Sequence, residues 1–213
     1  MFGFDLMQMV AGLPGLIIAM ALHEYAHARV AVAMGDFTPK LTGRLTLNPM
    51  AHIDPIGLLM LLVARFGWAK PVMVNPSNFR NRRWGEVFVA LAGPGANFAV
   101  AFVAMAVLML LTQVMDLSLS MGVRSVLWLI LVYNVNFGIF NLIPLPPLDG
   151  SRVLMAFLSP AQQYKFAGLE RYSFLILIVL LVTPVLGAIL IPLSQFIIRL
   201  YAAIWGVVFG VFL

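Results

Sequence analysis

The sequence predicts an all-α polytopic membrane protein with about five to six membrane segments. Of its 213 residues, 62% are hydrophobic and only 10% are charged, whereas a soluble domain carries about a quarter charged residues. Long apolar runs alternate with short polar loops, and a helix needs about 20 mostly apolar residues to cross a bilayer. Cysteine is absent, so any metal site must be built from histidine and carboxylate side chains.

The apolar runs indicate one domain over 1–213, built on three long core helices. In chain order, the expected elements are a core helix 6–34, a β and re-entrant region 37–66, a core helix 86–115, a core helix 123–149 and C-terminal helices 173–213.

The region that follows the first helix differs in pattern from the rest of the chain. Leu41, Leu45 and Leu47 alternate with polar residues between two prolines, and a period of two predicts a small membrane-associated β element within 37–56. The apolar run 57–66 is too short to span a bilayer and is interpreted as re-entrant or interfacial.

The distribution of positive charge predicts the orientation in the membrane. Loops 36–56, 67–85 and 150–172 hold most of the Lys and Arg residues, whereas the loop near 116–124 holds only Arg124. The positive-inside rule places the three basic loops in the cytoplasm, so the first helix runs inward. Contact with the lipid bilayer explains this charge, and no nucleic-acid partner is expected.

Three ionisable side chains interrupt the first apolar run, in the stretch ALHEYAHARV at 21–30. His23 and His27 are four residues apart, so they share one helix face and suit one Zn²⁺, with Glu24 beside them as a general base. The alternative is that these residues only pack between helices. Ionisable groups at membrane depth cost roughly 2.5–3.5 kcal/mol each on insertion scales, which favours a metal site inside the membrane.

Asp149 is the candidate for the third ligand that a catalytic zinc usually takes. It follows an inward-running span and therefore reaches the same side of the membrane as the histidine pair. Its context is NLIPLPPLDG, where prolines break the helix and Gly150 allows a tight turn that can aim a carboxylate. The alternative role for Asp149 is to cap a helix end.

HEYAH at 23–27, AGPGANF at 92–98 and NLIPLPPLDG at 141–150 together resemble the site-2 protease family, the intramembrane zinc metalloproteases of peptidase class M50. The resemblance covers nearly the whole chain and is closest to the compact branch without PDZ or CBS domains. It implies a three-helix catalytic core with one Zn²⁺ per chain. The zinc ligands would be His23, His27 and Asp149, and the base would be Glu24.

The resemblance also implies roles for two further pairs of residues. Asn141 and Pro144 match an N-x-x-P element, whose Asn is thought to engage the substrate backbone or the oxyanion. Gly93 and Asn97 match a G-x-x-x-N element, for which site support and plain helix packing are both open. One departure is Ser151, where a second glycine is common.

His52 is the one histidine outside the HEYAH motif. It could be a transient ligand or a substrate-site group, but the favoured interpretation is a loop histidine bonded to backbone or to Asp54.

The resemblance implies an intramembrane endopeptidase that cuts transmembrane protein substrates, often to release regulators such as anti-sigma factors. The expected location is a prokaryotic inner membrane, with the active site towards the cytoplasm. An unwound substrate is expected to pair with the strand at 41–47. Two alternatives stay open: a non-catalytic membrane scaffold of the same fold and, less favoured because the polar residues converge on one site, a metal-ion transporter.

Overall fold

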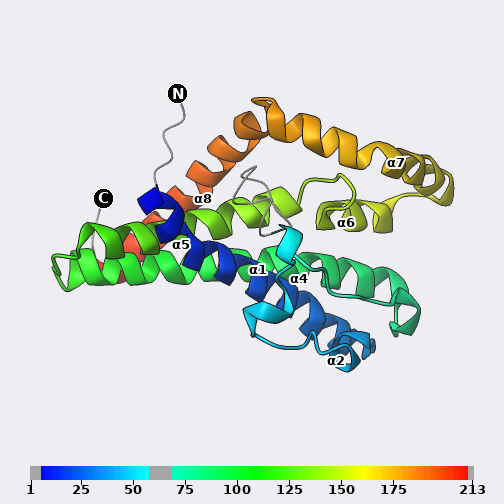
Figure 1. Cartoon of the computed structure of the whole chain (residues 1–213), viewed down its shortest axis with the longest axis horizontal. Coiled ribbons are helices and arrows are strands. Elements are labelled where there is room, and N and C mark those ends of the chain that lie inside the picture. The colour runs from blue at the N-terminus through cyan, green and yellow to red at the C-terminus, as the bar shows by residue number, and fades with distance from the viewer. Residues whose placement is uncertain (1–5, 58–68, 211–213) are drawn as a thin grey trace. The chain divides into compact units, whose positions relative to one another are not determined.

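The computed structural model describes residues 6–57 and 69–210, and over these ranges the chain is helical without a β-sheet (Figure 1). The helices are α1 Leu6–Met34, α2 Thr38–Leu41, α4 Arg82–Met109, α5 Met121–Asn141, α6 Asp149–Phe157, α7 Pro160–Val182 and α8 Val185–Phe209. Two 3-10 helices, Pro49–Ala51 and Pro76–Asn78, lie in the loops, and a π-helical turn, Leu110–Val114, extends α4. The predicted all-α class is confirmed.

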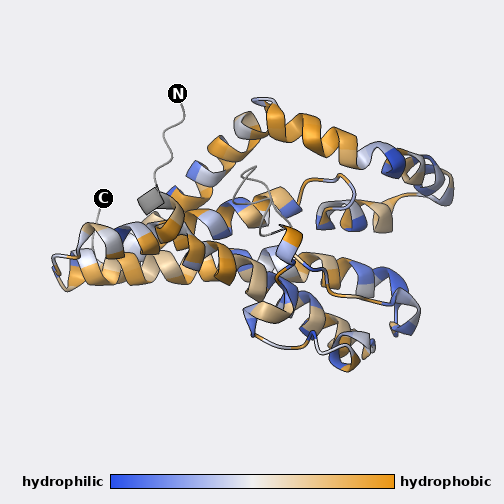
Figure 2. Ribbon diagram, in the orientation of Figure 1, coloured by the Kyte–Doolittle hydropathy of each residue, from blue (hydrophilic) through white to orange (hydrophobic). Residues whose placement is uncertain are grey.

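Four helices in the described ranges are long and apolar enough to cross a membrane. They are Met9–Met34 in α1, Arg82–Val114 in α4 with its π-turn, Met121–Asn141 in α5 and Val185–Phe209 in α8. Figure 2 shows these helices as mainly hydrophobic, whereas the start of α7 is polar. The chain is therefore an integral membrane protein, and the larger span count expected from the sequence is not established.

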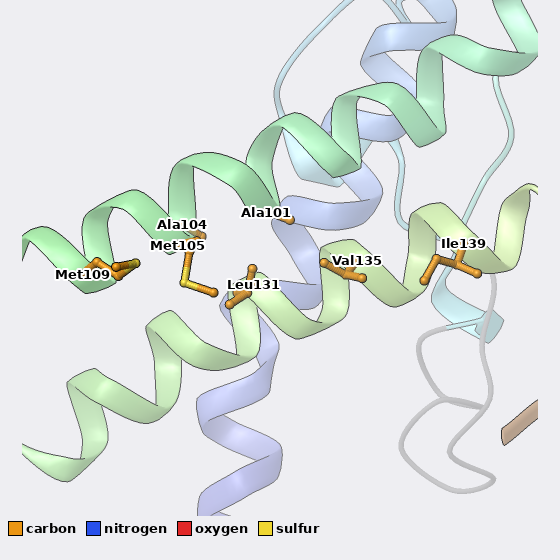
Figure 3. Packing of buried hydrophobic residues seen from close by; sticks show 7 residues of the cluster. All are labelled: Ala101, Ala104, Met105, Met109, Leu131, Val135 and Ile139. Carbon is orange, nitrogen blue, oxygen red and sulfur yellow. The ribbon is translucent and has the colours of Figure 1, made fainter. Parts of the chain in front are cut away.

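The chain divides into two compact units, each of which is described by itself. The first contains Met1–Ala19, Asn97–Phe140 and Ile178–Leu213, and the second contains Met20–Ala96 and Asn141–Leu177. In the first unit, small and flexible residues of α4 pack against branched residues of α5 (Figure 3). This core consists of Ala101, Ala104, Met105, Met109, Leu131, Val135 and Ile139.

A buried amide joins three helices of the first unit. The side-chain nitrogen of Asn97 in α4 donates to the carbonyl of Ala19 in α1 at 2.9 Å and to the amide oxygen of Asn134 in α5 at 3.0 Å. Both asparagines are fully buried. An apolar membrane offers no water to such groups, so these bonds hold the helices in one arrangement. Asn97 therefore contributes to helix packing, and its support of the site stays a prediction.

In the second unit, Asp36 fastens the segment before α4 to the end of α1. Its carboxylate is fully buried and accepts hydrogen bonds from the Thr38 hydroxyl at 2.6 Å, the Asn75 N–H at 2.7 Å and the Asn78 side chain at 2.8 Å. Burial alone would raise the pKa of Asp36. The hydrogen bonds outweigh burial and lower this pKa below its ordinary value, and the bond from the Thr38 hydroxyl contributes most among them.

The β element predicted within 37–56 is wrong for the described residues. Residues Thr38–Leu41 form a helix with proline in its first turn, and Gly43 turns the chain at a φ of +70°. Leu41 and Leu47 are 84% and 57% exposed, so the alternation does not mark a buried strand face. One isolated antiparallel bridge, Ile53–Ala69, is the only β pairing among the described residues.

Two other elements expected from the sequence are not found as predicted in the described residues. The core helix expected over 123–149 ends at Asn141, and Asp149 instead opens the separate helix α6. The re-entrant segment expected over 57–66 lies almost wholly outside the described residues.

Replacing Asp36 with Asn should lower the melting temperature at neutral pH, because an amide cannot accept all three bonds and a carboxylate bond is worth about 1.5–3 kcal/mol. A lowered pKa means that this stabilisation is complete above about pH 4 and is lost as the pH falls through the pKa of the folded state. The destabilisation by D36N should therefore shrink in acid. Thermal unfolding in detergent measures this effect, and Asp116→Asn, at an exposed position, is the control. Equal melting temperatures of D36N and the wild type at neutral pH would contradict the prediction.

Candidate metal centre

Two histidines of α1 bring their ring nitrogens together. His23 and His27 lie one turn apart and are 3% and 8% exposed, and their Nε2 atoms are 2.9 Å apart. The rings meet edge to face, with their centroids 4.5 Å apart. The i, i+4 spacing therefore produces the shared face that the sequence predicts.

A backbone carbonyl of α4 sets the protonation of His27. Its Nδ1 lies 2.6 Å from the carbonyl oxygen of Val89. A carbonyl only accepts hydrogen bonds, so Nδ1 carries the proton and Nε2 of the neutral ring keeps a lone pair. This is the arrangement in which a metal-binding histidine is usually held, with one nitrogen bonded to backbone and the other facing the metal.

Asp149 brings its carboxylate to the same point from the start of α6. Its Oδ2 lies 3.1 Å from Nε2 of His23 and 3.2 Å from Nε2 of His27. Gly150 makes this approach possible, since a Cβ there would collide with the backbone of Leu142 and Ile143. The expected tight turn is thus a close contact between two backbone segments.

The three ligand atoms fit a zinc ion. Two nitrogens and one oxygen form a triangle with edges of 2.9, 3.1 and 3.2 Å. One face of a tetrahedron with ligand distances of about 2.0 Å has edges of about 3.3 Å. Oδ2 of Asp149 is buried and accepts no hydrogen bond of normal geometry from the described residues. A buried acceptor in this state costs free energy unless a cation completes it.

The histidines also affect the ionisation of Asp149. Burial favours the neutral carboxyl, but the interactions with His23 and His27 outweigh it and hold the pKa of Asp149 well below its usual range. Asp149 is therefore a carboxylate at neutral pH, which is the form that binds metal.

A cavity of roughly 140 Å³ adjoins the three ligands in the second unit. Its lining residues are His23, Glu24, His27, Pro71, Val72, Val74, Val89, Ala90, Asn141, Pro147, Asp149 and Arg152. Glu24 is held at its wall because the N–H of Val72 donates to its Oε2 at 3.0 Å. A carboxylate is thus fixed beside the metal ligands without being one of them.

The other residues singled out in the sequence lie in different surroundings. Asn141 is 9% exposed and lines the cavity, whereas Pro144 is exposed and does not line it. Gly93 packs directly against the imidazoles, since a Cβ there would lie 2.5 Å from Nε2 of His27. Asn97 belongs to the helix contacts described above.

His52 is buried at 1% exposure, and its Nε2 lies 2.8 Å from the carbonyl of Thr46. It does not line the cavity. Asp54, its other suggested partner, instead caps the backbone N–H groups of Ile56 and Gly57. This placement agrees with the interpretation of His52 as a loop histidine bonded to backbone.

Three residues at the site were missed in the sequence, and two of them carried no usable signal there. Val89 and Val72 act through backbone atoms, so their side chains give no hint of the bonds to His27 and Glu24. Arg152 lines the cavity; it stands one turn after Asp149, and this i+3 spacing could have indicated it.

Comparison with known proteins adds independent information. Residues 112–184, which include Asn141 and Asp149, match the model of Peptidase family M50. "Putative zinc metalloprotease YwhC" of Bacillus subtilis is 39% identical over 197 residues, covering 89% of this chain and 90% of that protein. Rip2 of Mycobacterium tuberculosis, named in the same way, is 33% identical over 81% of this chain and 67% of its own length. No solved structure matches.

Replacing Gly93 with Ala should weaken zinc binding about 10–100-fold, because the new methyl group displaces the imidazoles that hold the metal. Titration against a zinc-specific chelator measures this. Gly95→Ala is the matched control in the same helix, since a Cβ there has no neighbour within 4 Å. Alanine favours a helix over glycine, so lost affinity would not come from helix propensity. Zinc affinity unchanged in G93A would contradict the proposed packing.

Proposed function

This chain belongs to peptidase family M50, and from that premise we propose that it is an intramembrane zinc endopeptidase, one that hydrolyses peptide bonds in or near transmembrane segments of membrane proteins. The observation that carries the proposal is the position of Glu24. It lines the same cavity as the three ligand side chains and is held there by the Val72 N–H. A scaffold would have no need of this carboxylate, and a group fixed beside the metal ligands rather than among them suits proton transfer in catalysis more than ion transport.

His23, His27 and Asp149 would hold one zinc ion per chain. When bound, the ion would supply Lewis acidity, which polarises a carbonyl group and activates water for attack. The bond between His27 and the Val89 carbonyl keeps a nitrogen lone pair directed to the metal.

Glu24 would act as the general base that takes a proton from the attacking water and returns it to the leaving amine. The N–H of Val72 occupies one carboxylate oxygen and fixes the orientation of the group. Asn141, from the cavity wall, would donate a hydrogen bond to the oxygen of the attacked carbonyl as negative charge develops there.

The substrate backbone must be extended to be cut, because a helix shelters its carbonyl groups in hydrogen bonds. No strand is found at 41–47, where substrate docking was expected, but the segment 71–74 lies outside any helix and lines the cavity through Pro71, Val72 and Val74. Its backbone is anchored at both sides, by Lys70 N–H to the His52 carbonyl and by Asn75 N–H to Asp36. We place an unwound substrate segment alongside it.

The proposal also includes the location of the protein and of its cavity in the cell. The basic loops favour a cytoplasmic position for the segment 69–81 and for α6, so the cavity would open towards the cytoplasm in a prokaryotic inner membrane. The partner of the protein would then be a transmembrane substrate that enters from the bilayer.

Glu24→Gln should retain zinc but reduce cleavage about 10²–10⁴-fold, because glutamine still accepts the Val72 hydrogen bond but cannot take a proton. Cleavage of single-span model substrates in lipid vesicles, with zinc content measured in parallel, checks this. Glu86→Gln is the control, since Glu86 pairs with Arg82 outside the cavity. Wild-type cleavage by E24Q would end the proposal.

A further inference from the structure

Helix α8 carries one charged residue within its candidate span. Val185–Phe209 is apolar throughout except for Ser194, Gln195 and Arg199. At 1.5 Å per residue, Arg199 lies about 21 Å from the first residue of this helix and about 15 Å from the last. A charge this far from both ends is costly in hydrocarbon and marks a functional contact by default.

Two bonds to α4 fix the depth of this arginine independently. The Tyr201 hydroxyl donates to the Phe98 carbonyl at 3.3 Å, and the Trp205 indole N–H donates to the Phe102 carbonyl at 3.0 Å. Phe98 lies at the middle of the candidate span Arg82–Val114. Arg199, two residues before Tyr201, therefore lies near the level of Phe98, at the middle of that candidate span.

Arg199 lies on a face of α8 that no other part of the first unit covers. At helical spacing this face comprises Ala188, Pro192, Gln195, Arg199 and Ala203, all exposed. We call this set the α8 outer face. The opposite side holds Ser194, Tyr201 and Trp205, which bond to α5 and α4. The first unit therefore leaves this face open to lipid or to another protein.

The described residues offer Arg199 no carboxylate. No ion pair to it is found among them, and the one described acid of the first unit, Asp116, lies beyond the π-turn, about 18 residues from the level of Phe98. In a second copy of the chain, the described carboxylates within the candidate spans already have partners. The described acids within the candidate spans are Glu24, which accepts from Val72, and Glu86, which pairs with Arg82.

We propose that the α8 outer face docks a transmembrane helix of a separate membrane protein, which carries an Asp or Glu near the middle of its span. The carboxylate pairs with the guanidinium of Arg199, and Gln195, one turn earlier, hydrogen-bonds the same group or the partner backbone. Ala188 and Ala203 flank the polar pair, and small residues let two helix backbones approach closely in a membrane. This docking is separate from the metal centre and does not depend on the proposed proteolysis.

The test measures binding of two synthetic peptides to the full-length protein in phosphatidylcholine vesicles by fluorescence energy transfer. Both peptides are Leu/Ala transmembrane helices, and they differ only in a central Glu or Gln. The wild type should bind the Glu peptide at least about five-fold more tightly than the Gln peptide. Arg199→Gln should abolish this difference, while Arg199→Lys should keep part of it.

Matched variants exclude simpler explanations. Arg124→Gln, which removes an exposed arginine near the start of α5, should leave the preference for the Glu peptide unchanged. Arg199→Glu should instead prefer a peptide with a central Lys, which shows that the variant is folded and that charge pairing decides binding. Equal binding of the Glu and Gln peptides to the wild type would overturn the proposal.

Discussion

The contact between α1 and α4 around the histidine pair is the interaction on which the site depends. Gly93 lets α4 approach the two imidazoles, and four residues earlier the Val89 carbonyl accepts a hydrogen bond from Nδ1–H of His27. Neither effect comes from the metal-binding side chains themselves. Without this contact, two histidines in an apolar helix would be free to bond with each other or with water, and their lone pairs would not converge.

The same requirement for satisfied polar groups explains the loop that covers the site. Buried backbone groups cost free energy unless they are hydrogen-bonded, and the segment 69–78 is held by specific acceptors on neighbouring parts of the second unit. Glu24 accepts from Val72, and Asp36 accepts from Asn75 and Asn78. One of these carboxylates is fully buried and structural, and the other faces the cavity and is available for chemistry.

The third ligand depends on an interruption of helical structure. Helix α5 ends at Asn141, and α6 begins at Asp149. The loop between them is rich in proline, which has no backbone N–H, so fewer donors there need a hydrogen-bond acceptor. Asn141 and Asp149 consequently reach one cavity from the two ends of that loop. Gly150 is essential to this arrangement because the backbones of the loop and of α6 nearly touch.

The sequence by itself determined the all-α membrane class, because apolar length is a local property of the chain. The i, i+4 rule also predicted that His23 and His27 share a helix face. It misjudged residues 37–56, where exposed leucines imitated the alternation of a strand. Only the tertiary structure decided this point, showed the hydrogen bonds that Asn97 makes between helices, and revealed the roles of Val72 and Val89. Their contributions are backbone atoms, whose partners lie 48 and 62 residues away, and no side-chain pattern encodes such contacts.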